Sequence, residues 1–206
     1  MSHIAESISD ILSRRWLEPR APTGPPVPGS VRRDTPVGAL GESRTSPWLN
    51  SQVRNDKRAE SLLSTAARAA LALGAPDLAS QTHGFRGALE RRKGNPRGIA
   101  RWFMAAYDVP GIAGLHRADA AYKAAHGLGT YGDRDGAAAL INSADELTTD
   151  LDGRADISSP VAYRLNPRWL RLPGGLAHLG LGNHQWAAES LRDGLGAMPS
   201  DWQDAG

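Results

Sequence analysis

A repeated turn pattern constrains the fold of this chain more than any other sequence feature. A large residue is followed at once by glycine and, six positions after the large residue, by alanine. The three copies are Leu73-Gly74 with Ala79, Tyr131-Gly132 with Ala137, and Leu181-Gly182 with Ala187, and Lys93-Gly94 with Ile99 is a looser copy. Glycine readily adopts the left-handed conformation that ends a helix, and a small residue early in the next helix lets the two helices approach closely. The pattern therefore predicts successive antiparallel helix pairs.

Seven stretches carry a helical pattern, and strand signals are nearly absent. β-Branched residues are few and do not alternate with polar residues over a useful length. Helix formers fill each stretch, and proline or glycine marks most of the ends. The predicted helices cover residues 58–73, 77–93, 97–109, 115–128, 134–147, 167–181 and 184–198, with an acidic loop over residues 148–160. We therefore predict an all-α protein whose antiparallel helix pairs form a tetratricopeptide-like α-solenoid.

The first fifty residues differ from the rest in composition. Seven of the fourteen prolines lie between Pro19 and Pro47, and proline removes backbone donors and restrains the residue before it. Apolar residues at every fourth position over residues 4–16 predict one short amphipathic helix. We therefore divide the chain into residues 1–54, a short helix plus a Pro/Gly-rich flexible segment, and residues 55–206, a helical-repeat domain.

Composition excludes several classes of protein. The absence of cysteine excludes disulfide scaffolds, thiolate metal sites and cysteine nucleophiles. The 24 Lys and Arg residues against 22 Asp and Glu residues give a net charge of +2, which argues against nucleic-acid affinity from overall charge alone. The sequence has no run of about 18 apolar residues that could span a membrane and no visible secretory signal. A cytoplasmic location is the expectation.

Part of the sequence matches tetratricopeptide spacing. Four consensus positions are occupied by Gly175, Ala187, Leu191 and Pro199, whereas Gly194 and His178 stand where the consensus prefers Ala and Tyr. More specifically, residues 58–206, with stretches such as QTHGFRGALERRKGNPRGIARWF and AAHGLGTYGDRDGAAALI, resemble the C-terminal helical-repeat segment of helix-turn-helix transcriptional regulators from filamentous GC-rich bacteria.

This resemblance implies a helical array that senses a peptide, a protein partner or an effector. In that family a separate N-terminal helix-turn-helix binds DNA, but residues 1–54 do not contain two adjoining helices joined by a short turn. We therefore expect a non-catalytic module for protein or peptide recognition, with a regulatory role like that of a transcriptional regulator. DNA would be bound directly or through a partner.

Motifs that carry chemistry are missing. Residues 127–132 fit G-x-G-x-x-G, but they follow a helical stretch rather than a strand, so we interpret them as a helix–helix turn and not as a nucleotide site. The six histidines show no H-E-x-x-H spacing, and no serine lies in G-x-S-x-G. The sequence thus predicts no catalytic residues, metal ligands or cofactor. A small-molecule enzyme with an unrecognised hydroxyl or carboxylate site stays as an alternative.

Aromatic residues are the candidates for partner recognition. Large aromatics contribute much of the energy at protein interfaces, although most also serve the core. We expect the concave face of the array to carry specificity through Trp102, Tyr107, Tyr122, Trp169 and Arg171.

A basic cluster supports a second interpretation. Its members are Arg86, Arg91, Arg92, Lys93, Arg97 and Arg101, offset in sequence only by Glu90. Such a patch binds phosphates or acidic partners, which makes direct DNA binding the alternative function. Cations at the end of a helix also interact favourably with its dipole, and this explains Arg91 to Lys93 without any ligand.

Overall fold

A computed structural model describes residues 56–151 and 167–198 of the 206-residue chain. The predicted N-terminal helix, the Pro-rich segment, most of the predicted acidic loop and Pro199 lie outside these described residues.

Every described element is an α-helix. In chain order they are α3 (Asp56–Ala72), α4 (Pro76–Arg92), α5 (Pro96–Tyr107), α6 (Gly114–Tyr131), α7 (Arg134–Leu151), α8 (Arg171–Gly180) and α9 (His184–Gly196). No strand occurs in residues 56–151 or 167–198, so the all-α prediction is confirmed for this part of the chain. None of these helices combines the length and apolarity needed to cross a membrane.

The predicted turns are present at the predicted glycines. Gly74, Gly94, Gly132 and Gly182 have φ angles of 63°, 66°, 103° and 77°, which is the left-handed region that favours glycine. The small residues that follow are buried: Ala79 and Ala137 are 0% exposed and Ala187 is 2% exposed. The turn pattern therefore combines a helix stop with a close contact in the next helix.

The two largest differences from the predicted helix boundaries are four residues each, at the end of α7 and at the start of α8. α7 continues through residues 148–151, which we predicted as the start of an acidic loop. The hydroxyl of Thr148 donates to the carbonyls of Ala144 and Asp145, a bond pattern that threonine can make within a helix. α8 begins at Arg171 rather than at Pro167, because the preceding residues form a separate turn in which the Leu170 amide donates to the Pro167 carbonyl at 3.2 Å.

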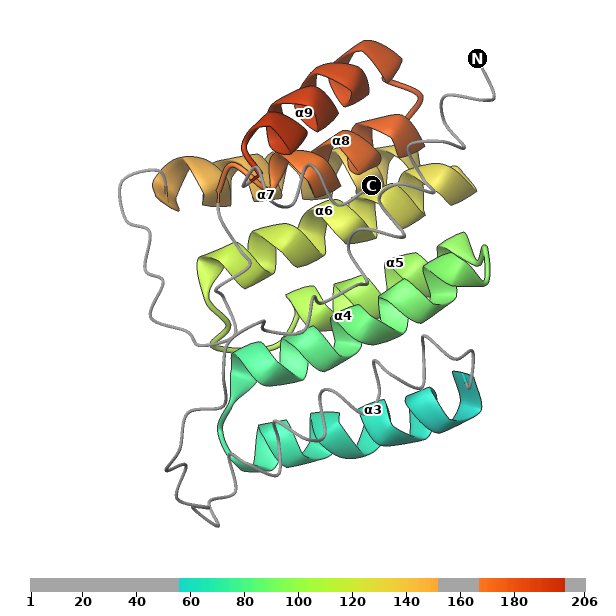
Figure 1. Ribbon diagram of the computed structural model, residues 1–206, viewed down its shortest axis with the longest axis vertical. Helices are drawn as coiled ribbons and strands as arrows, with labels where there is room; N and C mark the ends of the chain where they lie inside the picture. Colours follow the sequence, from blue (N-terminus) through green and yellow to red (C-terminus); the bar gives the residue numbers. More distant parts are fainter. Residues whose placement is uncertain (1–55, 152–166, 199–206) are drawn as a thin grey trace, which may run out of the picture.

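Helix α6 lies at the centre of the described structure. α3 packs on α4, α4 on α5 and α5 on α6, and α6 then packs on both α7 and α8, while α9 packs on α8 (Figure 1). The largest core cluster includes Leu115, Tyr122, Ile141 and Leu181, and thus joins α6, α7 and the end of α8. Because α6 has neighbours on several sides, it fixes the positions of the helices on which the candidate sites lie.

Glycines in the G-x-G-x-x-G stretch are explained by this packing. A Cβ atom on Gly127 would lie 2.5 Å from the Ala100 backbone nitrogen of α5, and one on Gly129 would lie 2.9 Å from the Gly180 carbonyl carbon of α8. Gly132 forms the turn after α6 with its left-handed φ angle. The three glycines therefore serve helix contacts and a helix stop.

Candidate functional site

Trp102 on α5 is the centre of a cation–aromatic cluster. The guanidinium carbons of Arg86 and Arg101 lie 4.2 and 4.6 Å from the centroid of the Trp102 ring. The His83 ring stacks against the same indole, with centroids 5.8 Å apart and planes inclined by 14°. Two cations over one indole interact favourably with the ring, and they also place positive charge beside it.

Arg86 is held in place by α3. Its Nη2 donates to the hydroxyl of Ser64 and, at 3.4 Å, to the carbonyl of Glu60. Burial lowers the pKa of Arg86, Glu60 opposes this shift, and the nearby Arg101 adds to it. An arginine remains charged despite such a shift. The pKa of His83 is lowered by burial and by Arg86, so the charge of this cluster at neutral pH comes from the arginines.

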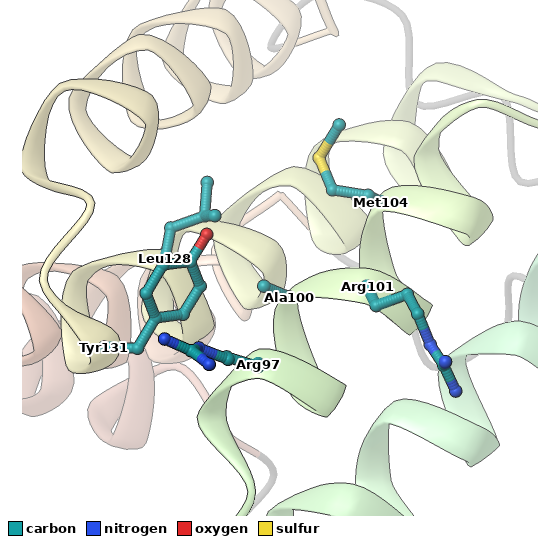
Figure 2. Close-up of a pocket in the computed structure, with 6 residues that line it drawn as sticks. All are labelled: Arg97, Ala100, Arg101, Met104, Leu128 and Tyr131. Atoms are coloured by element: carbon teal, nitrogen blue, oxygen red, sulfur yellow. The ribbon is translucent and has the colours of Figure 1, made fainter.

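A pocket lies on the opposite flank of α5, against the end of α6. Its volume is about 350 Å³, and its walls are Arg97, Ala100, Arg101, Met104, Leu128 and Tyr131. Figure 2 shows the Arg97 side chain reaching toward the Tyr131 ring, while the head of Arg101 points away from it. The guanidinium carbon of Arg97 lies 5.9 Å from the centroid of that ring. The pocket thus combines apolar side chains of α5 and α6 with two arginines of α5.

Arg101 connects the two features. It contributes to the pocket on the α6 flank of α5, and its guanidinium lies on Trp102 on the α4 flank. Arg97 and Arg101 are both exposed. We call the surface formed by Arg86, Arg97, Arg101, Trp102 and Tyr131 the α5 surface. It is basic, it has two exposed arginines, and it contains an apolar pocket.

The other members of the predicted basic cluster do not belong to this surface. Arg92 pairs with Asp56 at 2.6 Å, and Lys93 pairs with Glu60 at 2.6 Å and with Glu90 at 2.9 Å. Hydrogen bonds to Glu60 and Glu90 raise the pKa of Lys93. These pairs join α4 to α3, which locally neutralises two cations of the cluster.

Arg91, the sixth member, points in another direction. Its guanidinium carbon lies 5.8 Å from the centroid of the Phe103 ring, and Phe103 is 3% exposed. The six basic residues are therefore divided between the α5 surface, a set of ion pairs with α3, and the interior.

The two tyrosines predicted to bind a partner connect helices through their hydroxyl groups. The hydroxyl groups of Tyr107 and Ser143 are 3.1 Å apart, and the Tyr122 hydroxyl donates to Asp145 Oδ1 at 2.5 Å. Burial and then the hydrogen bond to Asp145 raise the pKa of Tyr122 well above its ordinary value. Ser143 and Asp145 are both on α7, so these tyrosines fix α7 against α5 and α6.

Trp169 and Arg171 lie at the opposite end of the described structure from α3. The indole Nε1 of Trp169 donates to the carbonyl of Ala197, just after α9, at 3.1 Å, and Arg171 is the exposed first residue of α8. The contacts of Trp102, by contrast, are with α4. The structure therefore does not bring the five predicted partner-binding residues together.

Sequence reasoning missed His83 and the pocket residues Met104, Leu128 and Tyr131. A signal was present in the spacing of Arg97, Arg101 and Met104, because positions i, i+4 and i+7 lie on one face of a helix. The contributions of α6 have no local signal, since they depend on how α6 packs against α5.

His126 on α6 makes stability depend on pH. Its Nδ1 lies 2.8 Å from the carbonyl oxygen of Leu176. Burial, assisted by the charge of Arg91 and opposed by the Leu176 hydrogen bond, lowers the pKa of His126 from 6.5 to about 4. Between these two values the unfolded chain binds a proton that the folded chain does not, so acidification favours unfolding.

We expect the free energy of unfolding to fall by about 1 kcal/mol between pH 7 and pH 5.5 because of His126. Urea midpoints measured across this range test the effect. In His126→Asn, the side-chain amide can still donate to Leu176. The free energy of unfolding of this variant should change less between pH 7 and pH 5.5 than that of the wild type. A variant profile parallel to that of the wild type would show that His126 does not titrate as inferred.

Neither similar proteins nor metal-ligand clusters in the described residues assign a function to this chain. No protein-family model, no curated protein and no solved structure matches the chain. Within residues 56–151 and 167–198, no group of three or more His, Asp or Glu side chains is placed to hold a metal ion. The chemistry of the α5 surface is therefore the basis for assigning a function.

Proposed function

We propose that this chain is a non-catalytic helical-repeat module that recognises a protein segment through the α5 surface. The segment combines a large apolar side chain with acidic residues. The apolar side chain enters the pocket beside Met104 and Leu128, and the carboxylates meet Arg97 and Arg101.

The arrangement of charge and cavity carries this proposal. Arg101 lies both on Trp102 and at the edge of the pocket, so a single ligand can contact the apolar side chains of the pocket and the guanidinium groups. A volume of about 350 Å³ is near the lower limit of ligand pockets, which run from about 300 to 1,000 Å³. It suits one or two side chains rather than a cofactor. Arginine also binds carboxylates through paired hydrogen bonds.

A tetratricopeptide-like repeat is part of the proposal. It is supported by the antiparallel order of the helices and by the left-handed glycines at four of the turns. A regulatory role, like that of the C-terminal segments of helix-turn-helix transcriptional regulators, follows from the sequence resemblance. In such a role the partner would be a regulatory protein or peptide.

Selection from a displayed library of random peptides tests the proposed specificity. We expect the wild-type chain to enrich peptides that place a large apolar residue next to Asp or Glu. The double variant Arg97→Glu/Arg101→Glu should bind these peptides at least about tenfold more weakly, because two attractive contacts become repulsive. Arg171→Glu/Arg192→Glu changes the net charge by the same amount on α8 and α9, and it serves as the matched control.

Two outcomes would contradict the proposed surface. Enrichment of peptides that lack acidic residues would show that Arg97 and Arg101 do not bind carboxylates of the partner. Loss of binding in the α8/α9 control, with binding retained in the α5 variant, would place recognition near Trp169 and Arg171 instead.

Direct DNA binding is the second candidate, favoured by Arg86, Arg97 and Arg101 around an aromatic ring. Its signature is a steep fall in affinity as salt rises, because phosphate contacts release counterions. Fluorescence anisotropy of a labelled duplex across a salt series measures this directly. Saturable, salt-sensitive binding that is lost in Arg97→Glu/Arg101→Glu would assign the surface to nucleic acid.

A further inference from the structure

A second group of charged side chains is enclosed by α4, α5 and α6. Arg91 from α4 and Lys123 from α6 lie 5.8 and 5.6 Å from the centroid of the Phe103 ring of α5. Asp119, one turn before Lys123, accepts a 2.6 Å ion pair from the Lys123 ammonium group through Oδ2. Phe103 is buried against α4 and α6, so this cluster lies on the side of α5 away from its exposed surface.

Arg91 has one edge of its guanidinium group unused. Its Nε and Nη2 are both buried, and neither has a hydrogen-bond partner within the described residues. Nε–H and Nη2–H point the same way in the guanidinium plane, and together they form the side-on fork that grips two oxygens of one carboxylate. Buried donors without partners are costly and rare in native proteins. Two of them on one edge can receive the two oxygens of one ligand.

The charges of the cluster select the ligand further. Lys123 and Asp119 neutralise each other through their ion pair, and His126 is uncharged at neutral pH because its pKa is lowered to about 4. Arg91 itself makes no ion pair within the described residues, so its single positive charge is uncompensated there by a direct partner. Asp119 acts on Arg91 electrostatically, yet the two do not form an ion pair within 4 Å. One uncompensated positive charge matches a monoanion, and the Asp119 carboxylate nearby disfavours a phosphate dianion.

One edge of the cluster reaches solvent, at Asp119 and Lys123. The side chains of Asp119 and Lys123 are 16% and 19% exposed. The second Asp119 oxygen, Oδ1, is buried and has no partner within the described residues. It can therefore accept a hydrogen bond from an N–H group of a ligand that carries the carboxylate.

We propose that the Nε/Nη2 edge of Arg91 binds a carboxylate group between α4 and α6. This site is separate from the α5 surface, and it does not depend on the function proposed above. The carboxylate belongs either to a small organic acid or to an acidic side chain of a peptide.

Titration of the full chain with sodium acetate tests the site. The Arg91 Nε–Hε resonance is observed by ¹⁵N NMR and assigned by correlation with the Arg91 backbone. We expect a saturable shift of this resonance with acetate. Sodium chloride at equal ionic strength and acetamide, which has acetate's shape without its charge, should not produce it.

Arg91→Lys keeps the positive charge but removes the two-donor edge. We expect it to bind acetate at least about tenfold more weakly, a loss typical of one charge-assisted hydrogen bond. Acetate-dependent change in melting temperature measures this loss in the variants. Arg92→Lys, at the neighbouring ion-paired position, is the matched control and should bind as the wild type does. If Arg91→Lys does not fold, the acetate, chloride and acetamide titrations of the wild type decide the question.

Two short peptides distinguish the sources of the carboxylate. If Ac-Ala-Glu-Ala-NH2 shifts the Arg91 resonance more tightly than acetate and Ac-Ala-Gln-Ala-NH2 does not, the site serves a peptide side chain. If acetate binds and neither peptide does, the site serves a free acid. A shift that is linear in acetate, or equal for acetate, chloride and acetamide, would overturn the proposal.

Discussion

Replacing Gly127 with alanine is expected to lower the free energy of unfolding by about 2–3 kcal/mol. The new Cβ would lie 2.5 Å from the Ala100 nitrogen, 2.9 Å from the Pro96 oxygen and 3.0 Å from the Ala100 Cα. All three atoms belong to the backbone of α5, so no side chain can rotate to relieve the contact. α5 and α6 must therefore move apart, and the core that joins them is disturbed.

Gly84→Ala is the matched control for this prediction. Gly84 lies inside α4, and its nearest neighbour to a new Cβ is a Phe103 ring atom at 3.6 Å, an ordinary contact. Alanine is favoured over glycine inside a helix by up to about 1 kcal/mol. We therefore expect Gly84→Ala to be neutral or stabilising, although the chemical change is the same.

Urea unfolding followed by circular dichroism measures both variants. Only Gly127→Ala should lower the midpoint, and only Gly127→Ala should disturb the α5 surface, because Ala100 lines the pocket. Equal stability of the two variants would show that α5 and α6 are not as close as the structure places them.

The helices could be predicted from the sequence because their ends are local events. Pro76 and Pro96 start helices, and Gly94 and Gly132 end them, through the conformations of single residues. Sequence reasoning failed where a boundary depended on weaker signals. The polar residues 148–151 read as a loop, yet α7 includes them.

The candidate site could be predicted only in part. Contacts between distant segments decide which basic residues form ion pairs and which stay on the α5 surface. Arg86, Arg92 and Lys93 look alike in sequence. Arg92 and Lys93 are paired with carboxylates of α3, whereas Arg86 packs on Trp102. No local pattern carries that difference, since the packing of α3 on α4 decides which cations have carboxylate partners.

The contact with Leu172 explains why position 194 is a glycine. A Cβ on Gly194 would lie 2.7 Å from Leu172 Cγ, 2.8 Å from its Cδ2 and 3.0 Å from its backbone nitrogen. Leu172 is 1% exposed and packs with Leu191 and Met198 in the core between α8 and α9. The large residue on α8 and the missing side chain on α9 are therefore two parts of one contact, and alanine at position 194 would force Leu172 to shift.

We expect Leu172→Ala to lower the free energy of unfolding by about 3 kcal/mol, through lost burial and the cavity that remains. Leu71→Ala, the same change at a side chain that is 55% exposed, is the control and should cost less than about 0.5 kcal/mol. Gly194→Ala alone should cost about 1–3 kcal/mol through overpacking. Thermal and urea unfolding of each variant give these values.

The double variant Leu172→Ala/Gly194→Ala separates this pairing from general core damage. Truncating Leu172 removes the two closest atoms, so of the three nearest atoms only the backbone nitrogen at 3.0 Å remains, and the new alanine at position 194 fills part of the cavity. We expect the double variant to be more stable than the sum of the single effects predicts, by about 1 kcal/mol or more. Strict additivity would mean that α8 and α9 do not interlock at this point. Because α9 packs on α8 and α8 on α6, the stability of the last helix pair depends on this contact.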